Sequence, residues 1–476
     1  MEDDELDISE LLNKYEQMRA HGKKMYLDAD EFSMLIEYYF SIGDLEEADN
    51  LTKEGLAMHP GSQQLMLIKA KELVDGQYFQ EALKYIDSIS DDGDIDIPLL
   101  KIECLIHLDM KDEAEAIIDD LFERELTVDQ LYTIDIEIGF IYNDVDEYDK
   151  AVPYLEDSLK IDSNNTEVLN DLSYAYEMLS NFPKAIEFNN HLLDIDPYSF
   201  ESWVNLGKLY SMSGEYGKAV DAFDFALTIN EGEVNALKLK ALAMCLNGNA
   251  EEAILIFEEC LKETPDDTSL YDSLLVSYEA LKEYDQMFKI INMKEEHLGS
   301  KGILMKRAWV YILEKQIEKA KELFDQIPES ERETYDYYCL EGELAIHEEN
   351  YIDAEKAYMK AALLSEDNEN VLNRLSIICV SLGKLEEAAD YLEQLFKLDP
   401  NFPDVKNRLA FVRFEIGNKE AFDKTMEMLS DDDLRNMLEL IDPESKDKIA
   451  ILNRESLLIR LDEARENRLL FKNNKY

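Results

Sequence analysis

The sequence lacks the features of a disulfide-bonded, secreted or membrane-spanning protein. Its five cysteines are scattered, odd in number and without a CxxC pair, so they predict buried thiols in a reducing compartment. No apolar run approaches the ~18 residues that a membrane span needs. The opening stretch MEDDELDISELLNKY is acidic, where a signal peptide would be basic and then apolar. We therefore expect a cytoplasmic protein without a membrane partner.

Sequence motifs for catalysis and cofactor binding are also missing. There is no GxGxxG, GxxxxGK(S/T), GxSxG or HExxH sequence, and no DxDxDG calcium loop. The six histidines show no metal-ligand spacing. Acidic clusters such as SISDDGDIDI lack the ligand order of an EF-hand. We therefore expect no catalytic residue, no metal ligand and no cofactor, and we interpret the chain as non-enzymatic.

Basic residues are scarce relative to acidic ones. The chain has 48 Lys and Arg against 106 Asp and Glu, for a net charge of −58. Such a chain repels nucleic acid and anionic membranes and attracts basic surfaces. The charge is uneven, because residues 401–476 hold 14 basic and 16 acidic residues. The acidity therefore indicates either a partner with a basic segment or a surface that serves solubility alone, and it excludes nucleic acid as the expected partner.

What the sequence does contain is a repeat. The small residue of an (E/K)A-like step recurs with gaps of 32 to 37 residues, most of them 34. The series is Ala48, Ala82, Ala114, Ala151, Ala185, Ala219, Ala253, Met287, Ala320, Ala354 and Ala388. Proline closes several units in phase with this series, as at Pro60, Pro197 and Pro400. A repeat of this length predicts an array of small supersecondary units.

Each unit has the pattern of two helices. In SWVNLGKLYSMSGEYGKAVDAFDFALTINE, apolar residues recur with helical spacing on both sides of a glycine-containing turn. Trp203 and Tyr210 share one face of the first helix, and Ala219 and Phe223 share one face of the second. We expect Gly207 and Ala219 to be small because two helix backbones approach closely there, and Phe223 to fill the space between one helix pair and the next.

This pattern resembles the tetratricopeptide repeat family, whose 34-residue helix–turn–helix unit carries W-x2-L-G-x2-Y, two small residues, an aromatic residue and a closing proline. The resemblance implies an all-α fold, a right-handed α-solenoid superhelix of stacked helix pairs. It covers residues 29–400 as eleven tandem units, followed by a degenerate twelfth unit at 401–433.

A stack of such pairs needs a cover at each end. We expect residues 1–28 to form an N-terminal capping helix and residues 434–476 to form a C-terminal capping helix region. In the latter, apolar residues fall on one broad face, at Ile449, Leu452, Leu458, Leu461 and Leu469. The alternative is that this amphipathic helix docks on a partner or on a second copy of the chain, which would make the protein an assembly or homo-oligomer component.

The resemblance also implies a function, because in this family the first helix of each pair lines a concave face that binds protein ligands. We therefore expect a scaffold that mediates protein–protein interaction by binding an extended peptide or a helix. The residues that stacking leaves free on this face are the candidate binding residues, namely Asn170, Tyr174, Asn205, Lys208, Lys238, Trp309, Asn373, Arg374, Asn407 and Arg408.

Four of these residues, Asn373, Arg374, Asn407 and Arg408, form a repeated Asn-Arg-Leu step, VLNRLS and VKNRLA, one period apart. Asparagine amides can clamp a peptide backbone, and arginines suit a carboxylate. The alternative is that Arg374 and Arg408 pair with acidic neighbours in this acidic chain. Trp309 faces a similar choice, between an exposed recognition anchor and a packed core residue.

Overall fold

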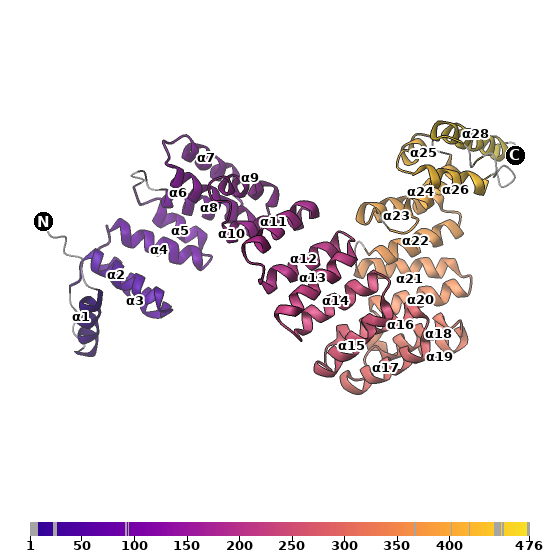
Figure 1. The fold of residues 1–476 in the computed structure, drawn as a ribbon, viewed down its shortest axis with the longest axis horizontal. Coiled ribbons are helices and arrows are strands. Elements are labelled where there is room, and N and C mark those ends of the chain that lie inside the picture. The colour runs from indigo at the N-terminus through magenta and orange to yellow at the C-terminus, as the bar shows by residue number, and fades with distance from the viewer. Residues whose placement is uncertain are drawn as a thin grey trace. The chain divides into compact units, whose positions relative to one another are not determined.

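The computed structural model describes residues 8–21, 26–90, 93, 95–365, 368–400, 402–417, 419–441, 449 and 452–473. The chain divides into two compact units, Met1–Gly248 (unit 1) and Asn249–Tyr476 (unit 2), which are described separately below. The described residues form helices and turns, with no β-strand among them (Figure 1). The predicted all-α fold is therefore confirmed.

Consecutive helices in unit 1 pack as helix–turn–helix pairs, from α2 with α3 to α12 with α13. Its helices are α1 (Ile8–His21), α2 (Ala29–Ser41), α3 (Leu45–Met58), α4 (Gln63–Asp75), α5 (Phe79–Ile86), α6 (Asp96–His107), α7 (Lys111–Phe122), α8 (Val128–Asp144), α9 (Tyr148–Leu159), α10 (Thr166–Met178), α11 (Phe182–Ile195), α12 (Phe200–Met212), α13 (Tyr216–Ile229) and α14 (Val234–Leu246). The first helices of successive pairs also contact each other, as α4 with α6 and α6 with α8.

Unit 2 continues the same pattern, with packed pairs from α16 with α17 to α24 with α25. Its elements are α15 (Ala250–Glu263), α16 (Thr268–Leu281), α17 (Tyr284–Leu298), α18 (Ile303–Leu313), α19 (Ile317–Phe324), the 3₁₀ turn η1 (Glu329–Glu331), α20 (Tyr335–His347), α21 (Tyr351–Leu364), α22 (Glu369–Ser381), α23 (Leu385–Leu398), α24 (Val405–Ile416), α25 (Lys419–Met426), α26 (Asp431–Ile441) and α28 (Arg454–Asn473).

Local sequence sets where these helices begin. Asn165, Ser199 and Asp267 precede α10, α12 and α16, and each side chain accepts a hydrogen bond from a backbone N–H of the first turn. Such caps satisfy donors that a helix start would otherwise leave unpaired. These three caps lie where the chain enters the first helix of a pair.

The turn between the two helices of a pair contains one residue in the left-handed region. Among the described residues these positions have φ between +57° and +87°, and they are Gly43, Gln77, Asp109, Asp146, Ser180, Gly214, Gly248, Lys282, Lys315, Glu349, Gly383 and Gly417. Their spacing of 32 to 37 residues repeats that of the small-residue series. The turn conformation therefore recurs with the period that the sequence predicts, even where the residue is not glycine.

The small-residue series forms the centre of the core. All eleven residues of the series are at most 2% exposed, Met287 included. Phe223 packs with Ala219 of its own helix and with Ala243 and Leu239 of α14, so it fills the space between one pair and the next helix, as predicted.

The reason for glycine at position 207 differs from the prediction. A Cβ atom there would lie 2.6 Å from the ring of Phe223, a side chain rather than a backbone. The same arrangement recurs at Gly342, where a Cβ would lie 2.5 Å from the Tyr358 ring. In these units glycine makes room for the aromatic ring of the second helix, because the ring lies against the first helix at that point.

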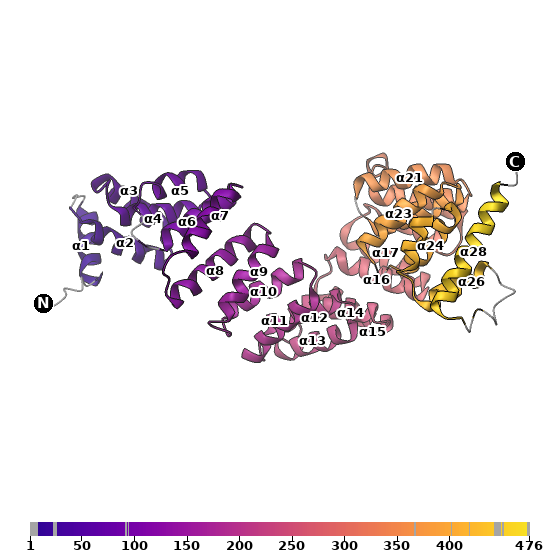
Figure 2. The same cartoon turned by 90° about the horizontal axis from the view of Figure 1, so that it is seen from above.

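The ends of the described chain pack on their neighbours. Leu11 of α1 belongs to the apolar cluster around Phe32, and Leu457 and Leu461 of α28 belong to the cluster around Leu434. Figure 2 shows α26 and α28 side by side, in agreement with their contacts. The side chain of Leu469 lies outside the described residues. The predicted domain boundaries, the capping role of both ends and the alternative of a second copy stay predictions.

Candidate interaction site

A cavity of about 510 Å³ opens on unit 2, along the first helices α16, α18, α20 and α22. Apolar side chains dominate its lining, with charged groups between them. The lining residues are Asp272, Leu275, Val276, Glu279, Met287, Ile291, Met305, Lys306, Trp309, Val310, Tyr335, Asp336, Cys339, Leu340, Tyr358, Asn370, Val371 and Arg374. An apolar cavity with a few polar groups is the usual form of a binding site.

Trp309 lies in this cavity. It is partly packed and partly exposed, so it combines the two alternatives of a core residue and a recognition anchor. Its indole N–H donates to Glu279 Oε2 at 3.2 Å, and its ring packs against the apolar cluster that contains Met305 and Leu340. The side chain is nevertheless only partly buried. One edge of the ring is therefore fixed from α16, while the remaining surface faces the cavity, which suits an anchor for an apolar ligand group.

Arg374 lies in the same cavity and is held by a buried carboxylate. Its Nε is 2.8 Å from Glu343 Oε1, and the Arg374 side chain stays 40% exposed while that of Glu343 is 6% exposed. The Tyr358 hydroxyl donates to the same carboxylate oxygen at 2.5 Å. Burial raises the pKa of the nearby Cys339 thiol to about 11, so it stays protonated at neutral pH. The Glu343 carboxylate thus orients one guanidinium toward the cavity.

The second Asn-Arg step is used differently. Arg408 donates to Asn373 Oδ1 and to Ser376 Oγ, both at 2.5 Å, and burial lowers the pKa of its guanidinium. Asn407 donates to Asp433 Oδ1 at 3.1 Å. Pairing with an acidic neighbour, the simpler alternative, therefore holds for Arg374 but not for Arg408. The Arg408–Asn373 hydrogen bond joins the two Asn-Arg steps to each other. Of the four residues in these steps, Arg374 alone lines the cavity.

The remaining candidates lie on unit 1. Asn170 and Tyr174 are exposed on α10, Asn205 and Lys208 are exposed on α12, and Lys238 is partly buried on α14. The structure thus places the sequence-predicted residues on first helices of both units. It brings together only Trp309 and Arg374 in the unit 2 cavity, and a binding role for any of the ten stays a prediction.

Three functional candidates escaped the sequence analysis. Tyr335, Asp336 and Cys339 line the cavity from α20, a helix that carries none of the ten predicted binding residues. A signal was present, because Asp336 and Asn370 both stand 13 residues before a left-handed turn residue, Glu349 and Gly383. If the repeat register is extended to the position 13 residues before each turn residue, it places Asp336 and Asn370 on the cavity face.

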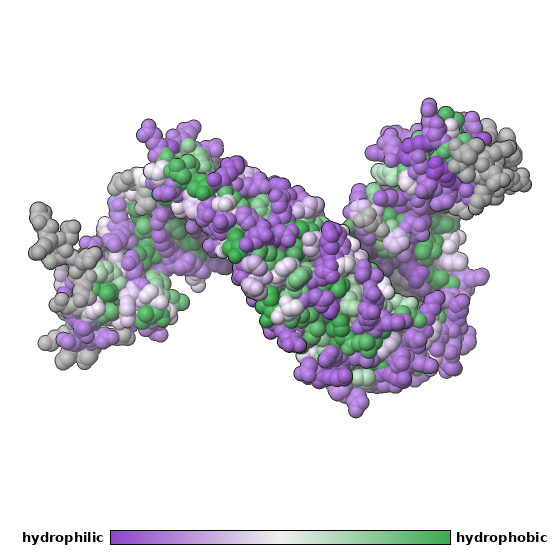
Figure 3. All heavy atoms as spheres, in the orientation of Figure 1, coloured by the Kyte–Doolittle hydropathy of each residue, from purple (hydrophilic) through white to green (hydrophobic). Residues whose placement is uncertain are grey.

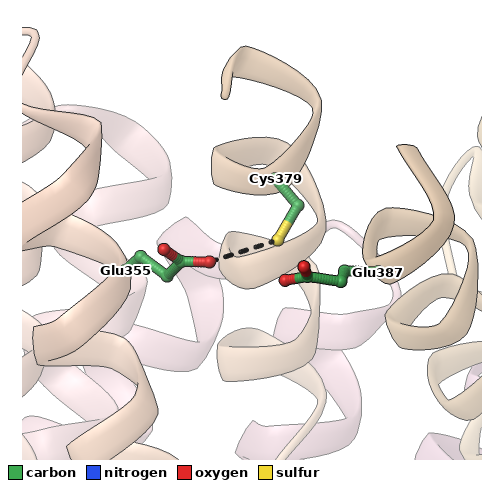
Figure 4. A group of neighbouring side chains, drawn as sticks. All are labelled: Glu355, Cys379 and Glu387. Carbon is green, nitrogen blue, oxygen red and sulfur yellow. Dashed lines mark hydrogen bonds between the residues drawn. The ribbon is translucent and has the colours of Figure 1, made fainter. Parts of the chain in front are cut away.

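Among the described residues of unit 2, Glu355, Cys379 and Glu387 of α21, α22 and α23 form a group of potential metal ligands (Figure 4). The Lys384 ammonium lies 2.6 Å from Glu355 Oε1 and 3.6 Å from Glu387 Oε2. Burial, reinforced by the two carboxylates, raises the pKa of the Cys379 thiol to about 11. A protonated thiol and an ammonium between two carboxylates form an ion-pair network that ties three helices together.

Several carboxylates of unit 1 lie close together on first helices. Burial raises the pKa of Glu103 on α6 to about 7, and the charges of Asp75, Glu137 and Asp144 act in the same direction. Burial likewise raises the pKa of Asp171, against a hydrogen bond from Asn143 that lowers it. At neutral pH these carboxylates therefore repel one another in a partly desolvated setting.

These shifts predict that Glu103→Gln will stabilise unit 1 above pH 7 by about 1 kcal/mol, a value reduced for solvent screening. A raised pKa means that the folded state binds the proton of Glu103 more tightly. The natural glutamate therefore contributes stability below pH ~4.5, and the chain loses this contribution as pH rises through about 7. Urea unfolding of both proteins between pH 5 and 8 measures the effect. The exposed Glu113→Gln on α7 is the control, and an equal gain from both variants would contradict the prediction.

Among the described residues, no helix is both long and apolar enough to cross a bilayer. Helix pairs joined by left-handed turns at a near-constant period define the class of protein, an α-solenoid. Family models for the tetratricopeptide repeat match residues 136–165, 188–221 and 370–402. The resemblance to the tetratricopeptide repeat family that the sequence pattern predicted is therefore confirmed over these three segments.

The chain is also similar to known proteins over part or all of its length. Anaphase-promoting complex subunit 7 of Homo sapiens and of Mus musculus are both 28% identical over 179 residues, which is 37% of this chain but only 31% of each relative. Among solved structures, yeast Tom70 is 16% identical over 98% of this chain and 99% of that chain, with a TM-score of 0.42. A tetratricopeptide repeat protein from Parabacteroides merdae is 18% identical over 52% of this chain and 99% of that chain, with a TM-score of 0.43.

Proposed function

We propose that this chain is a non-catalytic scaffold that binds a segment of another protein in the unit 2 cavity. Tetratricopeptide repeat proteins of the kind matched here are protein-interaction scaffolds. The observation that carries the proposal is the apolar cavity along α16, α18, α20 and α22, with Trp309 and Arg374 at its surface. The curated relatives are by name subunits of a complex, which supports a role within a multiprotein assembly.

The lining indicates the chemistry of the ligand segment. Leu275, Val310 and Leu340 offer an apolar floor, and Trp309 offers a ring surface for an aliphatic or aromatic side chain. Arg374 uses its Nε on Glu343, so its terminal nitrogens remain oriented for a carbonyl or carboxylate of the segment. An apolar anchor with an oxygen acceptor nearby is therefore the motif that the cavity fits.

The test compares the full chain with a Trp309→Ala/Arg374→Gln variant in affinity capture at moderate salt, followed by mass spectrometry. We expect the specific partner to be lost, because truncating a central aromatic anchor and a bidentate donor costs about 2 kcal/mol or more, a factor of thirty in affinity. Circular dichroism and thermal unfolding would check that the variant keeps its fold.

A matched control is available in the same unit. Phe411 stands at the same position of its repeat as Trp309, six residues before the left-handed Gly417, is exposed and does not line the cavity. Lys356 is an exposed cation on α21. The Phe411→Ala/Lys356→Gln variant makes the same charge change and should retain the partner. Equal capture by both variants, or release of every protein together as salt rises, would contradict the cavity as the binding site.

A further inference from the structure

In unit 1, four positions of each first helix lie on one open face. They stand 13, 9, 6 and 2 residues before the left-handed turn residue, as Glu167, Asp171, Tyr174 and Met178 do before Ser180 in α10. Steps of four, three and four residues keep side chains on a single helix face. The buried residues of α10 occupy other positions of the helix. These positions on α6, α8, α10, α12 and α14 are called the open stripe below.

The half of the open stripe on α6, α8 and α10 is acidic. Its carboxylates are Asp96, Glu103, Glu137, Asp144, Glu167 and Asp171, and its twelve positions include no lysine or arginine. Lys71 of the preceding α4 pairs with Asp96 at 3.0 Å. The charges of Glu137 and Asp144 act together with burial to raise the pKa of Glu103, so these three carboxylates lie close enough to repel one another. This half therefore carries a strong unbalanced negative field.

The buried side-chain amide of Asn143 lies beside the acidic half of the open stripe. Asn143 of α8 is 9% exposed, and its Nδ2 donates to Asp171 Oδ2 at 3.2 Å. Its Oδ1 is buried and accepts no hydrogen bond from the described residues. An unpaired acceptor of this kind costs free energy, and here it lies beside a carboxylate of the open stripe. The Asp171 carboxylate is only partly buried and can still accept from hydrogen-bond donors, which Lys and Arg side chains supply.

The part of the open stripe nearest the turns of α10, α12 and α14, called the apolar half below, is mostly apolar and exposed. Five of its six positions, Tyr174, Met178, Met212, Leu242 and Leu246, are between 41% and 61% exposed, and Lys208 holds the sixth. Figure 3 shows apolar atoms among the hydrophilic ones over this part of unit 1. Single exposed apolar residues are common, but five on neighbouring first helices form a patch of the kind that partners cover.

We infer that the open stripe of unit 1 binds one extended protein segment in which a run of Lys and Arg adjoins a run of Leu, Met or aromatic residues. The basic run lies along α6, α8 and α10, and the apolar run lies along α12 and α14. This inference rests on the proposed scaffold function and adds a second ligand-binding face with its own chemistry. Phosphate-bearing partners are disfavoured because six carboxylates would repel them.

The length of the segment follows from the helix spacing. Packed helices lie about 8–10 Å apart, so four steps from α6 to α14 span roughly 32–40 Å. An extended chain covers about 3.3 Å per residue, so the segment needs about 12 residues. A peptide of that length can therefore serve as the probe.

The experiment measures the fluorescence anisotropy of labelled peptides of about 12 residues with the full-length chain. Two probes join a Lys/Arg half to a Leu/Met/Phe half in opposite orders, and a third has the same composition with the two residue classes alternating. We expect one block peptide to bind at least tenfold more tightly than the alternating peptide, because only the block pattern matches both halves of the open stripe.

Two variants test the acidic half. Glu103→Gln, Glu137→Gln and Asp171→Asn together should weaken the block peptide at least tenfold at low salt and reduce the dependence of its affinity on salt. The control makes the same charge change on the exposed surface of second helices α7, α9 and α11, with Glu113→Gln, Asp149→Asn and Glu187→Gln. It should change affinity less than twofold, and equal losses from both variants would overturn the inference in favour of a general acidic field.

A third variant tests the apolar half. Met212→Ser, Leu242→Ser and Leu246→Ser together should weaken the block peptide about tenfold at every salt concentration, because apolar burial is not screened by ions. Unchanged affinity would overturn the inference. The Trp309→Ala/Arg374→Gln variant should bind the peptide normally. If only that variant lost the peptide, the open stripe would be excluded while the proposed function of the unit 2 cavity would stand.

Discussion

Phe223→Ala is expected to lower the free energy of unfolding of unit 1 by about 4 kcal/mol. The ring is 1% exposed and lies between Ala219 and Ala243, the latter on the next first helix. Its removal takes away apolar contact on both sides and leaves a cavity that the flanking helices cannot close without shifting their backbones. Because each repeat is supported only by its neighbours, the loss should spread to the adjacent pair. Urea unfolding followed by circular dichroism measures it.

A substitution at Gly207 tests the same packing of the Phe223 ring in a second way. A Cβ at position 207 would lie 2.6 Å from the Phe223 ring, so Gly207→Ala alone should destabilise unit 1 by about 2 kcal/mol. In the Phe223→Ala background the ring is gone, and the same substitution should stabilise by about 1 kcal/mol, since alanine favours helix over glycine. The two effects therefore differ in sign, and the coupling free energy is about 3 kcal/mol.

Gly217→Ala provides the control, because its Cβ on the neighbouring α13 would have no neighbour closer than 4.0 Å. It should stabilise both the natural chain and the Phe223→Ala variant by the same few tenths of a kcal/mol. Additive effects of Gly207→Ala and Phe223→Ala would show that the glycine serves some purpose other than room for the ring.

The sequence predicts the fold well because the repeat is a local signal. Ala219 and its counterparts stand at a fixed distance from a turn, and a helix pair can bury only the face that carries them. The spacing of the turns survives substitutions such as Lys282 for glycine, since one left-handed residue costs only about 1–2 kcal/mol and stacking holds it in place. Periodicity therefore specified the helices, the pairs and the core.

The candidate site could be predicted only in part. The register places Trp309 and Arg374 on open faces of first helices, but it cannot show which partner each side chain takes. Arg408 shares the position of Arg374 in the next repeat, yet its long side chain turns to Asn373 and Ser376 on α22. Which hydrogen-bond partner an arginine takes depends on its rotamer and on groups that lie one repeat away in the sequence. The cavity itself arises from several helices together, so no single unit of the sequence contains it.

Glu343→Ala is expected to destabilise unit 2 by about 3 kcal/mol, the second-largest effect, and to abolish partner binding in the cavity. The buried carboxylate accepts from the Tyr358 hydroxyl and from Arg374 Nε, so its removal leaves a buried hydroxyl and a guanidinium without their acceptor. Alanine also vacates space beside the ring of Tyr358. Urea unfolding measures the loss, with Glu341→Gln on the same helix as a control that should stay within about 0.5 kcal/mol.

Replacing the whole network separates stability from binding. The triple variant Glu343→Leu, Tyr358→Phe and Arg374→Met removes every charged and hydroxyl group of the network at once, so no buried group is left unpaired. Exchanging a buried ion pair for apolar residues of similar volume is often neutral or stabilising. We expect the triple variant to unfold within about 1 kcal/mol of the natural chain and still to lose the partner, because the cavity then lacks the Arg374 guanidinium. A folded triple variant that retains the partner would show that Arg374 contributes to the stability of unit 2 and not to recognition.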